Sequence, residues 1–447
     1  MNIMLNIDKL FKAAEKAGID IFEARISTTS KLSLSTFNTE RESFTVADDC
    51  VLKVRGTVGG KSGVFTSDRV DDEVIDTAIA ALKDAAAYGN PLDEEFFVKG
   101  GAYEYEQVNT YNDKLAKVEA GEYISLAKRI AQKALDSDKH VENVSVEIEY
   151  ECETEKLYNS RGLRLERSQN YAMIYASAKA ANVNEVQSGS HYAILSSLDG
   201  FDENKFAATL VANAVEALGG GSIETGKYTV VYTPECAAVL LKTMCDGFSA
   251  FNVEQHVSLL EGKIGTKAFA ENFSLSQTPI GSDVFCSPFD AEGVPQQNRV
   301  LVDKGVPTGY VYDLATAKRA GVKSTGNGRL VGGNVRPAVG FVTVHAGTLD
   351  LDGLFKAVGD GVYITDLGGV STGIDGRSGN YSLQANGFII KNGKKAVPVS
   401  LMTVAGNIVT DFKNLMAVAN DSTLTYYGVK TPSVAIRGLS ISGVKDN

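Results

Sequence analysis

The sequence predicts an α+β protein of two domains: an N-terminal α/β domain of helices and antiparallel strand meanders over residues 1–221, and a β-rich domain over residues 222–447. The length of 447 residues exceeds the roughly 250–300 residues at which a single core stops growing. The first half alternates between helical and two-residue hydrophobic periods. The second half carries most of the 44 glycines, which typically mark tight turns between strands. The run Gly219-Gly220-Gly221 separates the two patterns and marks the predicted boundary.

The N-terminal domain is predicted to contain two similar units, each with a helix followed by a meander of strands. The first unit has a helix over Ile7–Ala17, strands between residues 21 and 66 with turns at Asn38-Thr39, Asp48-Asp49 and Gly59-Gly60, and a helix over Asp71–Ala87. The second unit has the helical pattern Lys114–Leu135, alternating strands over Val141–Leu195 and a helix over Phe206–Leu218. Because Phe37-Asn38-Thr39 and Tyr158-Asn159-Ser160 fall at similar places in the two meanders, an internal duplication is our hypothesis.

The C-terminal domain is predicted to be a mostly antiparallel sheet or an open barrel. It begins with a strand over Tyr228–Tyr232 and a helix that starts at Pro234 and reaches Cys245. The rest reads as strands and glycine-rich turns. The clearest unit is Gly387–Val397, in which Asn392-Gly393 suits the positive φ angles of a type I′ hairpin turn.

Composition limits the classes of function and the location of the protein. The formal net charge is −11 and no basic cluster occurs, which disfavours binding to nucleic acid. The first residues lack a secretory signal, and no run approaches the roughly 20 apolar residues of a membrane helix. The five cysteines are scattered without a CxxC pair, as in a reduced cytoplasmic protein: Cys50, Cys152, Cys236, Cys245 and Cys286.

The sequence motifs alone support no specific chemistry. The four histidines (His140, His191, His256 and His345) are too far apart for two to share a helix face, and HExxH is absent. Gly369–Gly373 matches the GxSxG nucleophile pattern, but a loop rather than a helix is predicted after Ser371. A self-sufficient hydrolase that uses Ser371 or a cysteine remains the enzyme alternative. The segment Gly326–Gly333 lacks the Gly-Lys-Ser/Thr ending of a phosphate loop and is predicted to be a flexible or backbone-packing loop.

Three stretches of the second half carry a resemblance to a known family: Ser287–Val294, Thr316–Gly326, and Ser378–Ser382 through Asn386-Gly387-Phe388 to Ala405-Gly406-Asn407. In order and spacing they resemble the TldD/PmbA family, once called modulators of DNA gyrase, on its PmbA (TldE) branch. The similarity is continuous from about residue 226 and looser before it.

The resemblance implies a partner subunit without a metal. In this family a TldD subunit carries His-Glu-x-x-x-His and a late cysteine, and the pair cleaves peptides or unfolded segments inside a closed cavity. At the matching positions this chain has Lys242, Thr243 and Gly247, and no cysteine follows Tyr426-Tyr427-Gly428. The resemblance therefore implies no catalytic residue and no metal ligand here. The metal, expected to be zinc, would lie in a TldD-like partner, and a homodimer is the alternative assembly.

The expected role is to complete the cavity and to hold a peptide substrate. One mode is β-augmentation along the glycine-rich segment Gly373–Asn386, in which an extended peptide adds to a sheet edge. The predicted substrate-binding residues are Ser378, Asn380, Tyr381 and Asn386. A gyrase-associated regulatory protein is the further alternative, and the absence of a basic patch disfavours its direct contact with DNA.

Overall fold

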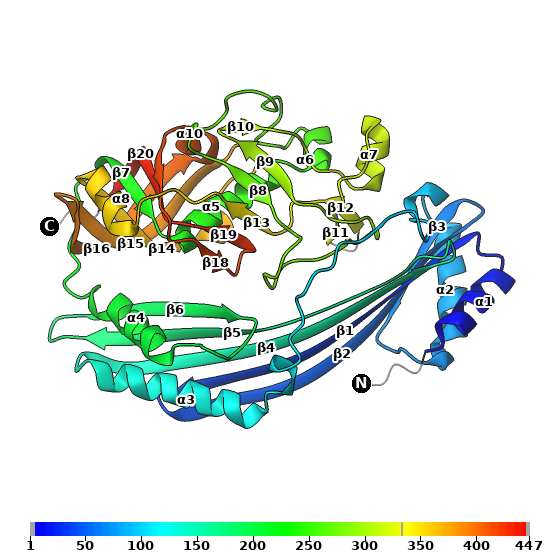
Figure 1. Cartoon of the computed structure of the whole chain (residues 1–447), viewed down its shortest axis with the longest axis horizontal. Coiled ribbons are helices and arrows are strands. Elements are labelled where there is room, and N and C mark those ends of the chain that lie inside the picture. The colour runs from blue at the N-terminus through cyan, green and yellow to red at the C-terminus, as the bar shows by residue number, and fades with distance from the viewer. Residues whose placement is uncertain (1–4, 332–333, 444–447) are drawn as a thin grey trace.

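The structure, a computed structural model, describes residues 5–331 and 334–443, so Met1–Met4 and the predicted loop end Gly332-Gly333 lie outside the described residues. Its N-terminal part is a six-stranded antiparallel sheet in the order β3-β2-β1-β4-β5-β6 (Figure 1). The strands are β1 (Ile21–Phe37), β2 (Glu40–Val58), β3 (Lys61–Ser67), β4 (Val141–Asn159), β5 (Arg164–Ala181) and β6 (Val186–Leu195).

One face of this sheet carries two helical cores at opposite ends of its long strands (Figure 1). On β1, Phe22 and Ala24 pack in the core formed with α1 and α2, whereas Leu32 and Leu34 pack in the core formed with α3 and α4. Positions two apart on a strand share a face, so both cores lie on the same side. The opposite face, which includes Arg25, meets the C-terminal part. The helical elements are α1 (Ile7–Lys16), η1 (Asp72–Val74), α2 (Ile75–Ala87), η2 (Glu94–Phe96), η3 (Leu115–Lys117), α3 (Ala120–Ser137) and α4 (Glu203–Val215).

The topology agrees with the predicted duplication. Each unit has a helix, three strands and a second helix, and β1 pairs with β4 at the centre of the sheet. Asn38, with a φ of 52°, lies in the turn after β1. Asn159 ends β4, and its side chain accepts hydrogen bonds from the backbone N–H groups of Arg161 and Leu163. The two asparagines therefore occupy equivalent turns, each at the end of a central strand.

One predicted turn, at Asp48-Asp49, is wrong. Strand β2 passes through both residues without a break, because β1 continues beside it and pairs Ser30 with Asp48. The Ser30 hydroxyl donates a hydrogen bond to the Asp48 carboxylate at 2.6 Å. Both carboxylates lie on an exposed part of the sheet, so an acidic pair does not interrupt the strand.

Five strands of the C-terminal part close a barrel in the order β16-β15-β14-β7-β20, because β16 also pairs with β20. The sequence predicted a sheet or an open barrel; closure depends on pairs such as Val404 with Ile441, which no local pattern specifies. The predicted hairpin turn is confirmed, with φ of 50° at Asn392 and 71° at Gly393. The strands are β7 (Gly226–Tyr232), β14 (Gly361–Gly368), β15 (Asn380–Lys391), β16 (Lys394–Asn407), β20 (Val434–Ser442) and the flanking β17 (Leu415–Val418).

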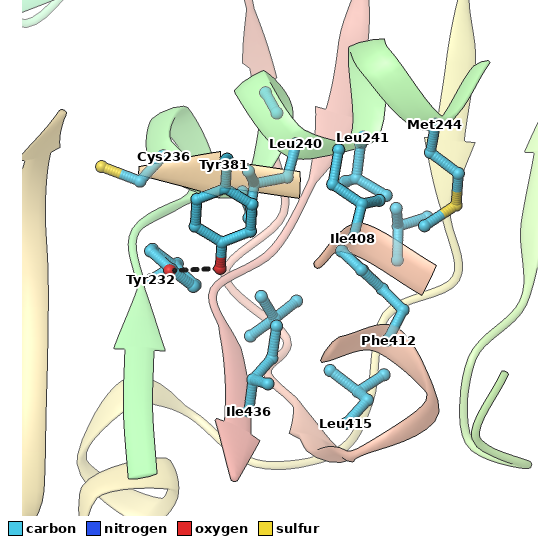
Figure 2. Close-up of a cluster of buried hydrophobic side chains, with 14 of the residues drawn as sticks. Tyr232, Cys236, Leu240, Leu241, Met244, Tyr381, Ile408, Phe412, Leu415 and Ile436 are labelled. Atoms are coloured by element: carbon cyan, nitrogen blue, oxygen red, sulfur yellow. Dashed lines mark hydrogen bonds between the residues drawn. The ribbon is translucent and has the colours of Figure 1, made fainter. Parts of the chain in front are cut away.

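A second sheet packs against the barrel through a central helix. Its order is β10-β9-β8-β13-β19-β18, and β11 with β12 forms a separate hairpin. Helix α5 lies between the two sheets, and Figure 2 shows Leu240, Leu241 and Met244 of this helix near Ile408 and Phe412. The strands are β8 (Leu275–Gln277), β9 (Arg299–Asp303), β10 (Val306–Pro307), β11 (Gly328–Val331), β12 (Asn334–Pro337), β13 (Val342–Val344), β18 (Thr423–Thr425) and β19 (Val429–Thr431). The helices are α5 (Pro234–Asp246), α6 (Ala250–Glu254), α7 (Leu314–Ala320), α8 (Leu351–Val358), α9 (Val370–Gly373) and α10 (Ile408–Lys413).

Across residues 5–331 and 334–443, no helix combines the length and the apolar character that crossing a membrane would need.

Candidate functional site

Helix α5 carries the positions where the resemblance places a metal site. The helix starts as predicted, with Pro234 in its first turn and the Thr233 side chain accepting a hydrogen bond from a backbone N–H. Lys242 is exposed near the end of the helix. The Thr243 hydroxyl donates to the backbone carbonyl of Val239 at 3.4 Å, so it is turned toward its own helix. Neither side chain has the imidazole or carboxylate chemistry that a catalytic zinc site needs.

The third position, Gly247, is buried and closely packed. A Cβ atom placed on Gly247 would lie 2.9 Å from Leu260 Cγ and 3.1 Å from Leu259 Cγ. The backbone φ of −66° would accept any residue, so packing alone excludes a side chain. A histidine at this position has no room in the present fold. The residues at all three positions therefore do not fit a catalytic metal.

The cysteines are poor candidates for a nucleophile. Burial raises the pKa of Cys245 to about 12 and that of Cys286 to about 11. Burial also raises the pKa of Cys152 and of Cys236. Cys50 is buried beside the N-terminal helices. Because the thiolate is the reactive form, the hydrolase alternative gains no support from any cysteine.

The histidines lie on separate elements, as their spacing suggested. Among the described residues, no group of three or more His, Cys, Asp or Glu side chains is arranged to hold a metal. Burial lowers the pKa of His191, whose ring centroid lies 4.8 Å from that of Phe206. The other three contact nearby polar side chains: His140 Nδ1 with Asp138 Oδ1, His256 Nδ1 with Glu261 Oε1, and His345 Nε2 with Ser276 Oγ, each at 2.8 Å.

Ser371 does not lie in a nucleophile elbow. Strand β14 precedes it, and Gly369 turns the chain with a φ of 72°. Ser371 then lies inside the four-residue helix α9, and an irregular segment follows in place of the long helix that the motif needs. In the part of the chain that the structure describes, no histidine forms a hydrogen bond with Ser371. The motif match therefore has no catalytic context.

The predicted substrate-binding residues divide between the two faces of β15. Burial alternates along the strand, so Asn380 and Asn386 lie on its exposed face and Tyr381 on its buried face. Tyr381 is only 4% exposed, and its hydroxyl lies 3.2 Å from the Tyr232 hydroxyl, as Figure 2 shows. Its side chain packs in the core beneath the strand. Apolar and polar residues alternate along this strand, and adjacent residues point to opposite faces. That pattern could have predicted that Tyr381 is buried and Asn380 exposed.

Ser378 and Asn380 lie together at the start of β15. The Ser378 hydroxyl donates to Asp375 Oδ2 at 2.6 Å. Asn407 Nδ2 donates to the backbone carbonyl of Ser378 at 2.8 Å and to Asn380 Oδ1 at 2.9 Å. Asn386 is farther along the strand, where its Oδ1 accepts a hydrogen bond from the backbone of Leu401 at 3.2 Å. The two groups mark opposite parts of one exposed strand face, and their contact with a peptide stays a prediction.

The stretch Ser287–Val294, part of the family resemblance, forms a loop around a buried carboxylate. Asp290 accepts backbone hydrogen bonds from Glu292 and Val294, each at 2.9 Å, and from Gly328 at 2.7 Å. Burial raises the pKa of Asp290 to about 6, although these N–H donors lower it in part. The backbone of Gly328 therefore packs against the protein's own carboxylate, as expected of a backbone-packing segment. The predicted loop is wrong for Gly328–Val331, which form strand β11 because they pair with β12.

The same loop joins the two parts of the chain. Arg25 and Arg167, from the N-terminal sheet, both form ion pairs with Glu155, which is only 4% exposed. Arg25 also donates to the backbone carbonyl of Ala291, and Arg167 to the Ser287 hydroxyl. This cluster is not evident from the sequence, because charged residues that alternate along a strand usually face water.

Comparison with known proteins places these features in context. Residues 225–443 match the family model of the PmbA/TldA metallopeptidase C-terminal domain, and residues 113–218 match that of the central domain. The chain is 24% identical over 434 residues to a metalloprotease PmbA homolog of Haemophilus influenzae, covering 96% of this chain and 94% of that protein. It is 24% identical over 432 residues to metalloprotease PmbA of Escherichia coli O157:H7, covering 94% and 92%.

Solved structures show the same fold over nearly the whole chain. A protein of Thermotoga maritima described as a modulator of a DNA gyrase superposes with a TM-score of 0.90 at 26% identity, covering 97% of this chain and 99% of that one. TldE of Thermococcus kodakarensis superposes with a TM-score of 0.87 at 20% identity, covering 98% and 100%.

Proposed function

The chain belongs to the PmbA/TldD family of metallopeptidases, and we propose that it is the non-catalytic, TldE-type subunit of a two-component peptidase. Its catalytic partner would be a TldD-like subunit that holds the metal, expected to be zinc. This chain would complete the cavity in which peptides or unfolded segments are cleaved. A homodimer is the alternative assembly, and neither form is proposed to bind nucleic acid.

The packing of Gly247 carries this proposal. A peptidase of the family needs a histidine here, and a Cβ atom alone would lie 2.9 Å from Leu260 Cγ. Lys242 and Thr243 supply neither the other histidine nor the glutamate that activates water. The chemistry of the pair would therefore lie in the partner.

The substrate role is proposed for the exposed face of β15. Strand β15 pairs with β14 on one side and with β16 on the other, so the expected β-augmentation at a sheet edge has no free edge here. We propose instead that an extended peptide lies across the exposed face, where Asn380 offers a side-chain amide and Ser378, just before the strand, a hydroxyl. We also propose a cytoplasmic location, which agrees with five cysteines that are all free thiols.

The test is cleavage of an unfolded peptide by the purified chain, by a TldD-like subunit from the same organism, and by their mixture. We expect only the mixture to cleave, and we expect a chelator to abolish that cleavage because the metal is catalytic in the partner. Size-exclusion chromatography with light scattering reports whether the two subunits form a complex.

Two controls make the result decisive. A Ser371→Ala variant should leave cleavage by the mixture unchanged, because Ser371 has no catalytic context. Cleavage by this chain alone that survives chelation would contradict the proposal, as would full activity of the partner alone under the same conditions.

A further inference from the structure

A cavity of about 670 Å³ lies beside the connector between α2 and α3. Three tyrosines and two cations line it: Tyr103, Tyr310, Tyr312, Arg299 and Lys323. No aspartate or glutamate is among the described residues around it, although the chain as a whole has 55 acidic side chains against 44 basic ones. The volume falls within the roughly 300–1,000 Å³ typical of sites for small ligands. The lining is therefore suited to an anion with an apolar or aromatic body.

Arg299 is the most informative group in this cavity. It is the first residue of β9, and its Nε atom is buried with no hydrogen-bond partner in the part of the chain that the structure describes. Burial lowers the pKa of Arg299, and no neighbouring carboxylate opposes this effect. A partly buried cation without a counter-charge is costly, because it loses water without gaining a partner. A bound anion would supply the missing partner.

Three hydroxyl groups of the cavity wall, those of Tyr310, Ser324 and Thr325, are already engaged with the protein. Tyr310 donates to the backbone carbonyl of Leu260 at 3.0 Å. Ser324 and Thr325 donate to the backbone carbonyl of Tyr312 at 3.2 Å and 3.1 Å. The charged groups free to meet a ligand are therefore Arg299 and the exposed Lys323, neither of which has an ion-pair partner among the described residues.

The cavity adjoins the segment that follows helix α5. Leu260, which packs against Gly247, accepts the hydrogen bond from Tyr310. Tyr310 in turn lines the cavity, and Ile264 from the same segment lines it as well. The other wall is Tyr103, from the connector that belongs to the N-terminal part. Both parts of the chain thus contribute to one site, which the Tyr310 hydrogen bond links to the residue packed against Gly247.

We propose that this cavity binds the free C-terminal carboxylate of a peptide, with Arg299 as the main partner and Lys323 at the rim. The planar guanidinium matches a carboxylate in two-pronged geometry, and its weak hydration suits a half-buried site. The terminal side chain would lie among Tyr103, Tyr312 and Ile264. The cationic lining of the cavity supports binding of an anion, whereas the choice of a peptide as that anion rests on the proposed function.

The experiment measures binding to the purified full-length chain without a partner. The probes are fluorescein-Ala-Ala-Phe with a free carboxylate and the same peptide with a C-terminal amide, followed by fluorescence anisotropy at 150 mM salt. We expect the free acid to bind at least roughly tenfold more tightly than the amide, because only the free acid carries a negative charge that can pair with Arg299. Equal binding of the two peptides would overturn the inference, and this comparison needs no variant that must fold.

Two variants locate the site. Arg299→Gln should remove the preference for the free acid and leave binding of the amide unchanged. Lys304→Gln is the matched control, because it removes the same charge from an exposed residue just after the same strand; its preference should stay as in the unmodified chain. Retention of the preference in Arg299→Gln would overturn the assignment.

Competition separates the sources of negative charge. N-Acetylphenylalanine should displace the probe at a lower concentration than inorganic phosphate, because the aromatic body also contacts the tyrosines. A stronger effect of phosphate would overturn the carboxylate assignment. These outcomes are independent of the cleavage assay. If the mixture of subunits does not cleave but the chain still prefers the free acid, only the proposed function is rejected. If the mixture cleaves but the chain shows no such preference, only this site is rejected.

Discussion

At the scale of single residues, the packing around Gly247 decides what its position can carry. Leu259 and Leu260 occupy the space that a side chain would need, and the backbone carbonyl oxygen of Met244 would lie 3.1 Å from an added Cβ atom. Lys242, by contrast, faces solvent near the end of the same helix. A histidine introduced at Gly247 would therefore clash with its neighbours, whereas one introduced at Lys242 would not.

We expect Gly247→Ala to lower the free energy of unfolding by roughly 1–3 kcal/mol, because even one added methyl group overpacks this core. Gly247→His should cost more. Lys242→Ala is the control, with a change within about 0.5 kcal/mol for an exposed site. Urea denaturation followed by circular dichroism measures all three, and a neutral Gly247→Ala would show that Leu260 yields at little cost.

A second residue makes stability depend on pH. Burial raises the pKa of Asp411 to about 6, well above the roughly 4 of an aspartate in an unfolded chain. Its contribution to stability is complete below about pH 4 and is lost as pH rises through 6, because the native state must then hold a buried charge. We expect Asp411→Asn to match the unmodified chain at pH 4 and to exceed it by up to about 3 kcal/mol at pH 8.

Urea denaturation of both proteins at pH 4, 6 and 8 measures this difference, and the comparison cancels all other titrating groups. A difference that does not change with pH would show that Asp411 has an ordinary pKa in the folded protein.

At the scale of elements, strand β15 separates a structural face from a candidate binding face. Asn380 and Tyr381 are neighbours in the chain, yet one is exposed and the other is buried against Tyr232. Their substitution should therefore affect different properties of the protein.

We expect Tyr381→Phe to cost roughly 1–3 kcal/mol of stability, because it removes a buried hydroxyl partner of Tyr232, and to leave cleavage by the subunit pair unchanged. Asn380→Ala should change stability by less than about 0.5 kcal/mol and should reduce cleavage several-fold. Thermal unfolding and peptide cleavage measured on the same preparations test both. Unchanged cleavage with Asn380→Ala would remove this residue from the predicted site.

The elements also differ in how well their structure could be predicted from the sequence. Local patterns predicted the hairpin at Asn392-Gly393 and the start of α5 at Pro234, because turn and capping chemistry depends on adjacent residues. They failed at Asp48-Asp49, where pairing with β1 overrides a turn-like composition. They could not reveal barrel closure or the cavity around Arg299, because both bring together segments that are distant in the chain. Only the family resemblance gives Lys242, Thr243 and Gly247 a meaning as metal positions, because no local pattern of the sequence marks them.

At the scale of the whole molecule, the two parts are joined by buried charges. Glu155 pairs with Arg25 and Arg167, which reach across to the loop around Asp290. Such a junction is specific, because each charge depends on its partners for solvation.

We expect Glu155→Gln to destabilise the protein by roughly 3–5 kcal/mol, since it removes the ion-pair partner of the buried Arg25 and of the part-buried Arg167. Lys114→Gln breaks an ion pair with Asp199 whose side chains are 81% and 74% exposed, so its effect should stay below about 1 kcal/mol. Differential scanning calorimetry measures both changes. Similar small effects in the two variants would show that water reaches the junction.

Closure of the barrel also has a consequence during protein synthesis. Strand β7 starts at Gly226, and its partner β20 is not complete until Ser442 has been made. At roughly 5–20 residues per second, the ribosome needs on the order of tens of seconds to supply that partner. The N-terminal sheet, with all its strands within residues 21–195, can fold meanwhile. The nascent barrel strands wait with one edge open, which makes this interval the period in which chaperones would protect the chain.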